Sequence, residues 1–377
     1  MLTSPKKIAI FGAGAIGRRV NALIKFNNME LKALYYCDNN TKLHGKIIDS
    51  LPVISAHSLS EIYQQNEIDF VLIAVSNSYL KEISEQLVEY KINNVFITPH
   101  YYLSKNTCGI SKSNIMLKIE ANKPRLKYFE FHICDHCNMN CTGCGHFSNI
   151  SKEYYADVDA YAKDLFRLKE LFWGVERIRL MGGEPLIHDK LNEFIDITGE
   201  VFPDSLICIA TNGILLNKMP PNLFDAVRGK NARFDISLYP PMYNKKDDLE
   251  ILLDIYEVSY KISISNRFIA THSLDPINNN TSSYENCKSS QCHFLRNGHL
   301  SNCGIPQLIK TYYDYFGLGS DTISICSENK YNIYEESNGW ELNEKLSKPI
   351  PMCSHCNIPG RDFAWNNTSK EMSDWIA

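Results

Sequence analysis

Residues 134–144 read CDHCNMNCTGC, which places four cysteines within eleven residues. They directly follow Lys127–Ile133 (KYFEFHI), whose alternating side chains predict a β-strand. The chain has thirteen cysteines in all, and most of the others do not stand alone either. In a reducing compartment, thiols grouped in this way indicate metal ligation rather than a disulfide framework. The fold must therefore turn sharply after this strand and gather the thiols at its end.

Length and composition set wider limits. With 377 residues, 44% of them hydrophobic, the chain is too long for one core and predicts two or three domains. The net charge of −4 and the pI near 6.3 indicate no basic face, so nucleic acid is not an expected partner. We find no secretory signal pattern and no apolar run of membrane-spanning length. We therefore expect a cytoplasmic protein without a membrane segment.

The first hundred residues alternate strand-like and helix-like segments. A short apolar run, Lys7–Phe11, precedes Gly12, Gly14 and Gly17 in the order G-x-G-x-x-G, and Asp38 follows the next strand-like run. Such glycines allow a tight turn and leave a helix N-terminus free for an anion, while the acidic residue can hold a ribose. We predict a doubly wound Rossmann-like domain over residues 1–105, with Gly12, Gly14, Gly17 and Asp38 as binding residues and NAD as a candidate ligand.

Two other interpretations of this segment stay open. In the first, the glycine-rich turn binds no ligand and the domain serves for docking. Residues 38–55, DNNTKLHGKIIDSLPVIS, resemble a stretch of nucleotide-sugar-associated domains such as those that precede sugar acyltransferases. That resemblance implies a nucleotide-sugar rather than NAD.

A second strand–helix alternation begins at the cysteines and predicts a parallel sheet. The expected strands are Lys127–Ile133, Ile178–Met181, Leu206–Ala210, Phe234–Leu238 and Ile262–Phe268. The first four end, in order, in the cysteine run, in GGEP at 182–185, in TNG at 211–213 and in SLYP at 237–240. In α/β folds the carboxyl ends of parallel strands share one edge, where ligands bind. The four segments therefore predict one common pocket.

The spacing Cys137-x3-Cys141-x2-Cys144, with MGGEP at 181–185 and TNG at 211–213, resembles the radical S-adenosylmethionine (SAM) superfamily. The resemblance implies a partial (β/α)6 barrel over residues 122–284, a [4Fe–4S] cluster and SAM. It assigns iron to Cys137, Cys141 and Cys144, which are soft ligands suited to such a cluster. It assigns the methionine end of SAM to Gly182, Gly183 and Glu184, and its ribose and carboxylate to Thr211, Asn212 and Ser237.

Zinc is the alternative for this first cluster. Cys134-x2-Cys137 and Cys141-x2-Cys144 offer four sulfurs for a tetrahedral site, although the gap between the pairs is short. The chain also departs from the family at Gly143, where many members have an aromatic residue that packs on adenine. We expect Phe147 to substitute for it.

A small cysteine-rich extension is expected over residues 285–377. Cys287, Gly298 and Cys303 match the opening of SPASM and twitch extensions, and Cys353 and Cys356 follow later. The resemblance implies a second [4Fe–4S] cluster, with a structural zinc site as the alternative. The candidate ligands number five, because Cys292 also lies in this region, and either Cys287 or Cys292 is spare. Four single cysteines are expected to be structural thiols: Cys37, Cys108, Cys208 and Cys326.

The motifs together predict an enzyme that splits SAM reductively into a 5′-deoxyadenosyl radical, with flavodoxin or ferredoxin as the electron donor. The first domain indicates a carbohydrate or nucleotide-sugar substrate, as in surface polysaccharide biosynthesis, with epimerisation, dehydrogenation or dehydration as the outcome. Three alternatives are a peptide-modifying radical SAM maturase, an NAD-dependent oxidoreductase with structural clusters, and a non-enzymatic redox or metal-binding protein.

Overall fold

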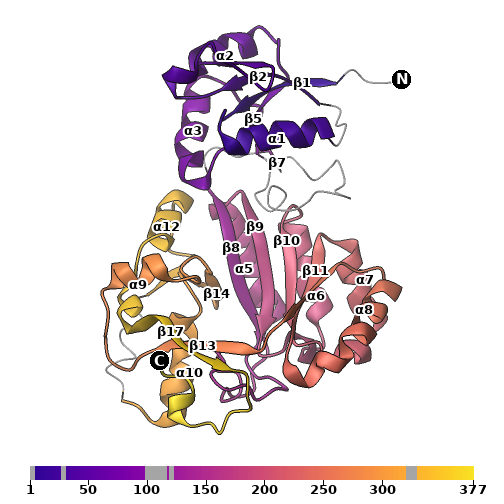
Figure 1. Ribbon diagram of the computed structural model, residues 1–377, viewed down its shortest axis with the longest axis vertical. Coiled ribbons are helices and arrows are strands. Elements are labelled where there is room, and N and C mark those ends of the chain that lie inside the picture. Colours follow the sequence, from indigo (N-terminus) through magenta and orange to yellow (C-terminus); the bar gives the residue numbers. More distant parts are fainter. Residues whose placement is uncertain (1–4, 27–30, 98–116, 119–122, 320–328) are drawn as a thin grey trace. The chain divides into compact units, whose positions relative to one another are not determined.

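The computed structural model describes residues 5–26, 31–97, 117–118, 123–319 and 329–377. The chain divides into two compact units, Met1–Pro124 and Arg125–Ala377 (Figure 1). Both are mixed α/β, as the sequence predicts. Cys108 and Cys326 lie outside the described residues. In the described part of the chain, every helix is too short or too polar to span a bilayer.

The first unit is built around a seven-stranded sheet in the order β3-β4-β2-β1-β5-β6-β7. Its inner strands from β4 to β6 are parallel, while β3 and β7 pair antiparallel with their neighbours. The strands are β1 Lys6–Phe11, β2 Leu31–Cys37, β3 Ile47–Ile48, β4 Leu51–Ile54, β5 Phe70–Ile73, β6 Val95–Ile97 and β7 Leu117–Lys118. The helices are α1 Ala15–Phe26, α2 Ala56–Gln64 and α3 Asn77–Glu89.

The turn from β1 into α1 requires glycine at two positions. Gly12 has φ +109°, a region that other residues rarely adopt. A Cβ on Gly17 would lie 1.8 Å from the carbonyl oxygen of Gly12, so the helix approaches the turn as closely as the backbone allows. Strand β1 enters this turn with Ile8 and Ile10 fully buried, because parallel sheets are covered on both faces.

The second unit contains an eight-stranded sheet in the order β12-β11-β10-β9-β8-β14-β15-β16. Strands β8 to β12 are parallel, and β14 adds to the other side of β8 in parallel. The strands are β8 Arg125–Cys134, β9 Gly174–Gly182, β10 Leu206–Thr211, β11 Ala232–Leu238, β12 Tyr260–Ile264, β14 Phe294–Arg296, β15 His299–Ser301 and β16 Lys330–Asn332.

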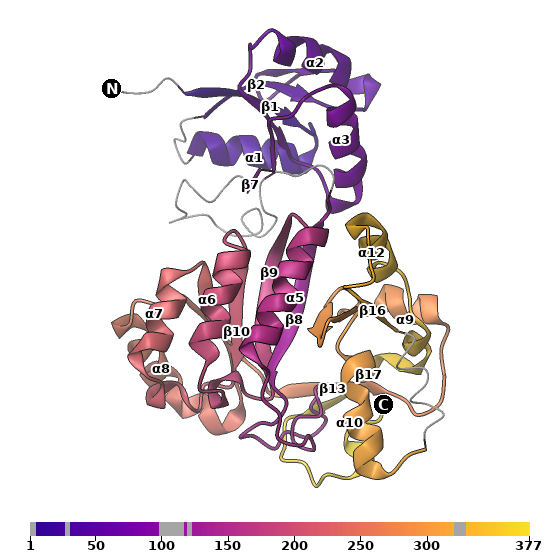
Figure 2. The ribbon, with the colours of Figure 1, turned by 180° about the vertical axis from the view of Figure 1, so that it is seen from behind.

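One face of this sheet is covered by the helices that connect its strands, as Figure 2 shows from behind. They are α5 Val158–Leu171, α6 Leu191–Val201, α7 Pro221–Gly229 and α8 Lys246–Ile255. Between helices and sheet lies a core in which Phe129, Ile178, Ile207 and Phe234 are fully buried. This apolar face fixes the strands, and the opposite face is free to carry polar side chains.

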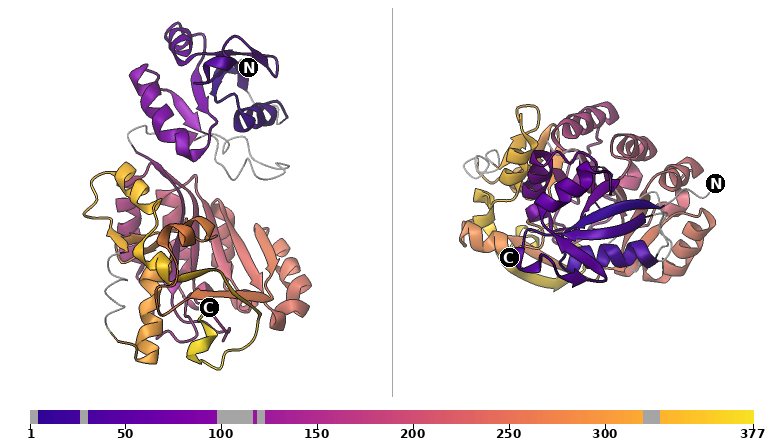
Figure 3. Two further views of the ribbon diagram at one scale, coloured as in Figure 1. Left: turned by 60° about the vertical axis from the view of Figure 1, so that its left-hand side comes forward. Right: turned by 90° about the horizontal axis from the view of Figure 1, so that it is seen from above.

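The remaining elements of the second unit are drawn in orange to yellow in Figures 1 and 3. They include β13 Arg267–His272, α9 Asn280–Asn286, α10 Ile305–Phe316, α12 Gly339–Leu346 and β17 Cys356–Ala364. The predicted strand Ile262–Phe268 is wrong in extent, because the chain breaks between β12 and β13. Strand β13 leaves the parallel sheet and pairs antiparallel with β17. Asn297 and Gly298, an Asn-Gly pair typical of tight hairpin turns, join β14 to β15, and both residues have positive φ.

Candidate functional site

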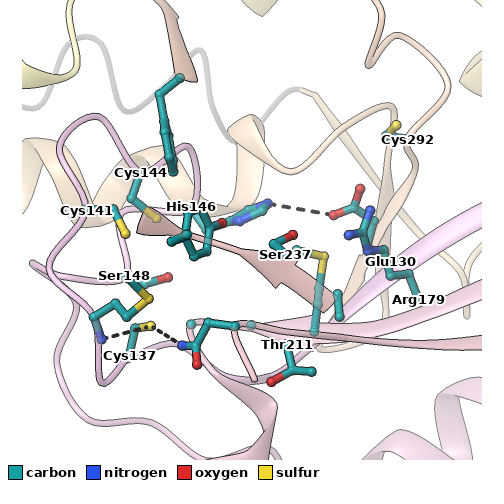
Figure 4. Close-up of a pocket in the computed structure, with 18 of the residues that line it drawn as sticks. Glu130, Cys137, Cys141, Cys144, His146, Ser148, Arg179, Thr211, Ser237 and Cys292 are labelled. Atoms are coloured by element: carbon teal, nitrogen blue, oxygen red, sulfur yellow. Dashed lines mark hydrogen bonds and ion pairs between the residues drawn. The ribbon is translucent and has the colours of Figure 1, made fainter. Parts of the chain in front are cut away.

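The carboxyl ends of β8 to β11 meet at one pocket of about 390 Å³ (Figure 4). Of the nine residues assigned to the first cluster and to SAM, eight line it: Cys137, Cys141, Cys144, Gly182, Gly183, Thr211, Asn212 and Ser237. They come from four separate segments of the chain. The parallel sheet brings these segments together because each follows a strand that ends at the same edge.

The three predicted iron ligands present their sulfurs to this pocket. The backbone N–H of Met139 and the side-chain amide of Asn212 donate to Cys137 Sγ over 3.4 and 3.8 Å. Burial raises the pKa of the Cys137 thiol to about 12 and that of Cys141 to about 11, the latter against a hydrogen bond from Trp365. The positive charge of a bound metal would stabilise the thiolate forms here. Three soft sulfurs around one cavity fit an iron–sulfur cluster.

Cys134, the fourth cysteine of this run, does not line the pocket. Its thiol is fully buried and donates to the carbonyl oxygen of Glu184 over 3.1 Å. Burial raises its pKa to about 12. Cys134 therefore joins the end of β8 to the end of β9 as a packing and hydrogen-bonding residue.

The glycine pair after β9 lets two chain segments touch. Gly182 has φ +149°, and a Cβ there would lie 2.0 Å from the carbonyl oxygen of Cys134. A Cβ on Gly183 would lie 2.0 Å from the carbonyl oxygen of His136. The Gly183 N–H donates to Cys134 O over 2.9 Å. The cysteine loop and the glycine pair thus form one cradle that any side chain would fill.

Glu184 lies behind the pocket instead of lining it. Its carboxylate is fully buried and accepts hydrogen bonds from Thr211 Oγ1 at 2.6 Å, from the Asn212 N–H at 2.8 Å and from the Leu186 N–H at 3.2 Å. Burial raises its pKa to about 7, against these three donors. Glu184 therefore holds the TNG turn in place and reaches the pocket only through it.

A charged wall faces the cysteines across the pocket, and we did not predict it from the sequence. It is formed by Glu130, Arg177, Arg179, Cys292 and Tyr128. Figure 4 shows Glu130, Arg179 and Cys292 on one side and the three cysteines on the other. Glu130 accepts from Tyr128 Oη at 3.0 Å, and the Arg177 guanidinium lies 4.7 Å from the centre of the Tyr128 ring.

The sequence feature that indicates this wall is the two-residue period of strands β8 and β9. In β8, Tyr128 and Glu130 alternate with the buried Phe129 and Phe131, and in β9 the residues Arg177 and Arg179 flank Ile178 in the same way. The register pairs Tyr128 with Arg177 and Glu130 with Arg179. Charged residues at alternate positions of two adjacent strands must share a face.

The later cysteines separate into two places. Cys287, Cys303, Cys353 and Cys356 line a second cavity, whereas Cys292 lines the first pocket with Glu130. Burial raises the pKa of Cys303 well above its usual range and that of Cys356 to about 12. Of the two cysteines left open by the sequence, Cys287 is therefore the one that shares a cavity with the other three.

Phe147 does not substitute for an aromatic residue at Gly143. Its side chain is buried in a core cluster, where it contacts the Tyr312 ring. Gly143 has φ +63°, and a Cβ there would lie 2.4 Å from the ring of Phe363. Tyr239 and Phe268 do line the pocket, and their rings stack with centroids 5.7 Å apart.

In the first unit, Gly12, Gly14 and Asp38 line a cavity of about 560 Å³. Gly17 is not among its lining residues and instead packs against Gly12. The Asp38 carboxylate accepts from the Ala13 N–H at 2.8 Å and from the Asn40 N–H at 2.9 Å. Asp38 thus stabilises the glycine turn, a role that the motif alone did not predict.

Two family models match the chain. Residues 4–98 match the C2185-like N-terminal family, and residues 131–239 match the radical SAM superfamily. A GTP 3′,8-cyclase of Geobacter sulfurreducens is 31% identical over 110 residues, which cover 29% of this chain and 33% of that protein. A GTP 3′,8-cyclase of Sulfurovum sp. is 25% identical over 260 residues, covering 63% of this chain and 77% of that protein. The first four relatives are matched over 33% to 53% of their own length.

Solved structures show weaker likeness. BtrN in complex with AdoMet and 2-DOIA covers 68% of this chain and 100% of its own, at 18% identity and a TM-score of 0.37. UDP-D-quinovosamine 4-dehydrogenase from Vibrio fischeri covers 30% of this chain and 93% of its own, at 21% identity and a TM-score of 0.25. The family match includes the cysteine run, the glycine pair and the TNG turn that line one pocket. Residues 131–239 of the chain are therefore a radical SAM domain.

Proposed function

We propose that the chain is a radical SAM enzyme acting on a polar small molecule. The observation that carries this proposal is the pocket in which Cys137, Cys141 and Cys144 meet the glycine pair and the TNG turn. Cys137, Cys141 and Cys144 would hold a [4Fe–4S] cluster with one iron free of protein sulfur, and the bound cluster would supply the electron for cleavage of SAM into methionine and a 5′-deoxyadenosyl radical that abstracts hydrogen from substrate.

In this proposal each group of pocket residues has a separate role. The three thiolates hold the cluster, and Gly182 and Gly183 leave room for the methionine end of SAM. Thr211, Asn212 and Ser237 supply hydrogen-bonding groups for the rest of SAM, in a position that Glu184 fixes for the first two. Tyr239 and Phe268 offer apolar ring surface beside them.

The charged wall supports a substrate with polar or ionic groups. Glu130, Arg177 and Arg179 can each form charge-assisted hydrogen bonds to hydroxyl, phosphate or base groups. A carbohydrate or nucleotide-sugar fits this chemistry, with epimerisation, dehydrogenation or dehydration as the outcome. A nucleoside triphosphate is the second candidate, because several relatives are GTP 3′,8-cyclases by name.

We also propose the finer features of the architecture. The first unit is a Rossmann-like domain that binds the nucleotide part of the substrate or NAD beside Gly12, Gly14 and Asp38. The parallel strands of the second unit form a partial barrel. A second [4Fe–4S] cluster binds in a twitch-like extension through Cys287, Cys303, Cys353 and Cys356, and Cys292 is not a ligand.

Anaerobic turnover tests the enzymatic proposal. The full chain, reconstituted with iron and sulfide, is incubated with SAM, a strong one-electron reductant and a panel of uridine- and guanosine-linked sugars and GTP. We expect 5′-deoxyadenosine from the wild type and none from a variant with Cys137, Cys141 and Cys144 changed to Ala. A well-loaded wild type that forms no 5′-deoxyadenosine with any compound would refute the proposal.

The transfer of deuterium from a labelled compound to 5′-deoxyadenosine identifies the substrate. A true substrate carrying deuterium at the attacked carbon passes that deuterium to 5′-deoxyadenosine, whereas an inert compound does not. Transfer from a labelled sugar supports the nucleotide-sugar candidate, and transfer from labelled GTP supports the second candidate. A peptide-modifying enzyme would show transfer from neither.

A further inference from the structure

Residues 363–375 pack against the cysteine loop, although they lie more than two hundred positions further along the chain. The Thr142 N–H donates to Asn366 O, and the Thr368 N–H donates to Asn140 O, both over 2.9 Å. Between these bonds, Cys141 and Asn367 form an antiparallel bridge. We call residues 363–375 the strap, because backbone bonds on both sides of Cys141 bind it to the loop.

Two tryptophans of the strap donate indole N–H groups to the loop, but to different kinds of acceptor. Trp365 Nε1 lies 3.1 Å from the sulfur of Cys141. Trp375 Nε1 lies 3.0 Å from the backbone carbonyl oxygen of Cys144. Trp375 is 3% exposed and packs edge-on against Tyr312 and Phe316. One indole therefore contacts a ligand atom, while the other anchors the backbone.

Several features hold the Trp365 indole at its acceptor. The Trp365 backbone N–H donates to Asn266 O over 2.8 Å, at the point where β13 and β17 pair. On the other side, the Phe363 ring occupies the space that a side chain at Gly143 would need. Cys141 itself is only 8% exposed, so water has little access to its sulfur.

A hydrogen bond to a ligating sulfur favours the reduced form of an iron–sulfur cluster. Reduction adds one negative charge, which spreads over the sulfurs, and an N–H dipole aimed at one of them stabilises that charge. The effect is larger where little water reaches the sulfur, and Cys141 is largely buried. Contacts of this kind beyond the ligands are known to tune metal sites.

We propose that Trp365 raises the reduction potential of the cluster held by Cys137, Cys141 and Cys144, and that the strap positions its indole for this purpose. The inference rests on the proposed cluster site. The redox couple consists of the oxidised and the one-electron-reduced cluster. An external one-electron donor supplies the electron, and no bond to Cys141 forms or breaks. Trp365 is a positioning residue, since it acts through the sulfur and not on substrate.

A redox titration of the reconstituted full chain without SAM tests the proposal, with the reduced cluster followed by electron paramagnetic resonance. To isolate the first cluster, each variant is made in a background with Cys303 and Cys356 changed to Ala. We expect Trp365→Phe to keep its iron but to show about a tenfold lower ratio of reduced to oxidised cluster at a fixed potential, which corresponds to about 59 mV for one electron.

Trp375→Phe is the matched control, because it removes an indole N–H from the same loop without touching a sulfur. It should titrate with the unchanged chain, even if its melting temperature falls. A benzothienyl-alanine at position 365, which keeps the shape of tryptophan and lacks the N–H, should shift as Trp365→Phe does. This variant excludes a packing explanation.

The outcomes separate the two proposals. A background chain with no reducible cluster at Cys137, Cys141 and Cys144 would contradict the proposed function. A reducible cluster whose potential is the same with tryptophan, phenylalanine and benzothienyl-alanine at position 365 would overturn this inference alone. An equal shift in Trp375→Phe would also overturn it, because the effect would then follow loop packing.

Discussion

At the scale of single residues, Glu184 is a fully buried carboxyl group that joins the GGEP and TNG motifs. Its pKa rises from 4.5 to about 7 because it is fully buried. Between these values the folded chain binds a proton that the unfolded chain has released, so stability falls as pH rises through this window. The loss amounts to roughly 3 kcal/mol by pH 7.5.

Urea unfolding of the metal-free chain at pH 5 and pH 7.5 checks this prediction. The wild type should lose stability between the two pH values relative to Glu184→Gln, whose side chain does not titrate. Equal pH dependence in the two proteins would contradict the assignment. The variant should be less stable than the wild type at low pH, because Gln cannot accept from both Thr211 and Asn212 in the same way.

The spare cysteine of the extension gives a second prediction at this scale. Cys292→Ser should keep the full iron content of about eight per chain, since its thiol lies in the first pocket. Cys287→Ser should lose about half of it, because it removes a sulfur from the second cavity. Iron and sulfide analysis after anaerobic reconstitution checks both variants. The reverse pattern would exchange the roles of the two cysteines.

Motif residues were predictable from the sequence because their spacing suits the ligand proposed for them. Cys137, Cys141 and Cys144 are an example, since three irons of one proposed cube would set the distances between their sulfurs. Glu130 and Arg179 were not predicted, although their alternation was visible. A charged side chain inside a strand can face either solvent or a pocket, and only the pairing of the strands determines which of the two it faces.

At the scale of elements, the hairpin of β14 and β15 depends on its glycine. Gly298 has φ +71°, and its N–H donates to the buried Asp164 carboxylate over 2.8 Å. A Cβ there would lie 2.8 Å from the ring of Tyr334. We expect Gly298→Ala to destabilise the chain by about 1–3 kcal/mol.

Denaturant unfolding measures this change, with Gly229→Ala as the matched control. Gly229 ends α7 with no positive φ and no atom within 4 Å of an added Cβ. Alanine there should be neutral or slightly stabilising, because it lowers the entropy of the unfolded chain. Similar losses in both variants would contradict the role given to the Gly298 turn.

Element types were predictable where hydrophobic period and turn chemistry agree, as in β8 or in the Asn297-Gly298 turn. The break between β12 and β13 was not, because Ile262–Phe268 has the composition of one strand throughout. Its division depends on β17, which offers a partner almost one hundred residues later. Pairing over such a distance leaves no local signal.

At the scale of the whole molecule, the sequence predicted two α/β domains and a small C-terminal extension, whereas the chain divides into two compact units, the second of which includes residues 285–377. The same reasoning gave the common edge at which the four motifs meet. It did not give the strap, because residues 363–375 carry no motif and contact the cysteine loop through backbone bonds and two indoles. Contacts of this kind depend on how the whole second unit packs, and the local sequence does not indicate them.

The central claim is that Cys137, Cys141 and Cys144 hold a cluster with one iron open to SAM. The most direct test reduces the reconstituted chain and adds SAM labelled with ¹⁵N at its amino group. We predict that pulsed electron–nuclear resonance will detect hyperfine coupling between this nitrogen and the reduced cluster. A cluster that reduces normally but shows no coupling, and a spectrum that added SAM leaves unchanged, would contradict the account.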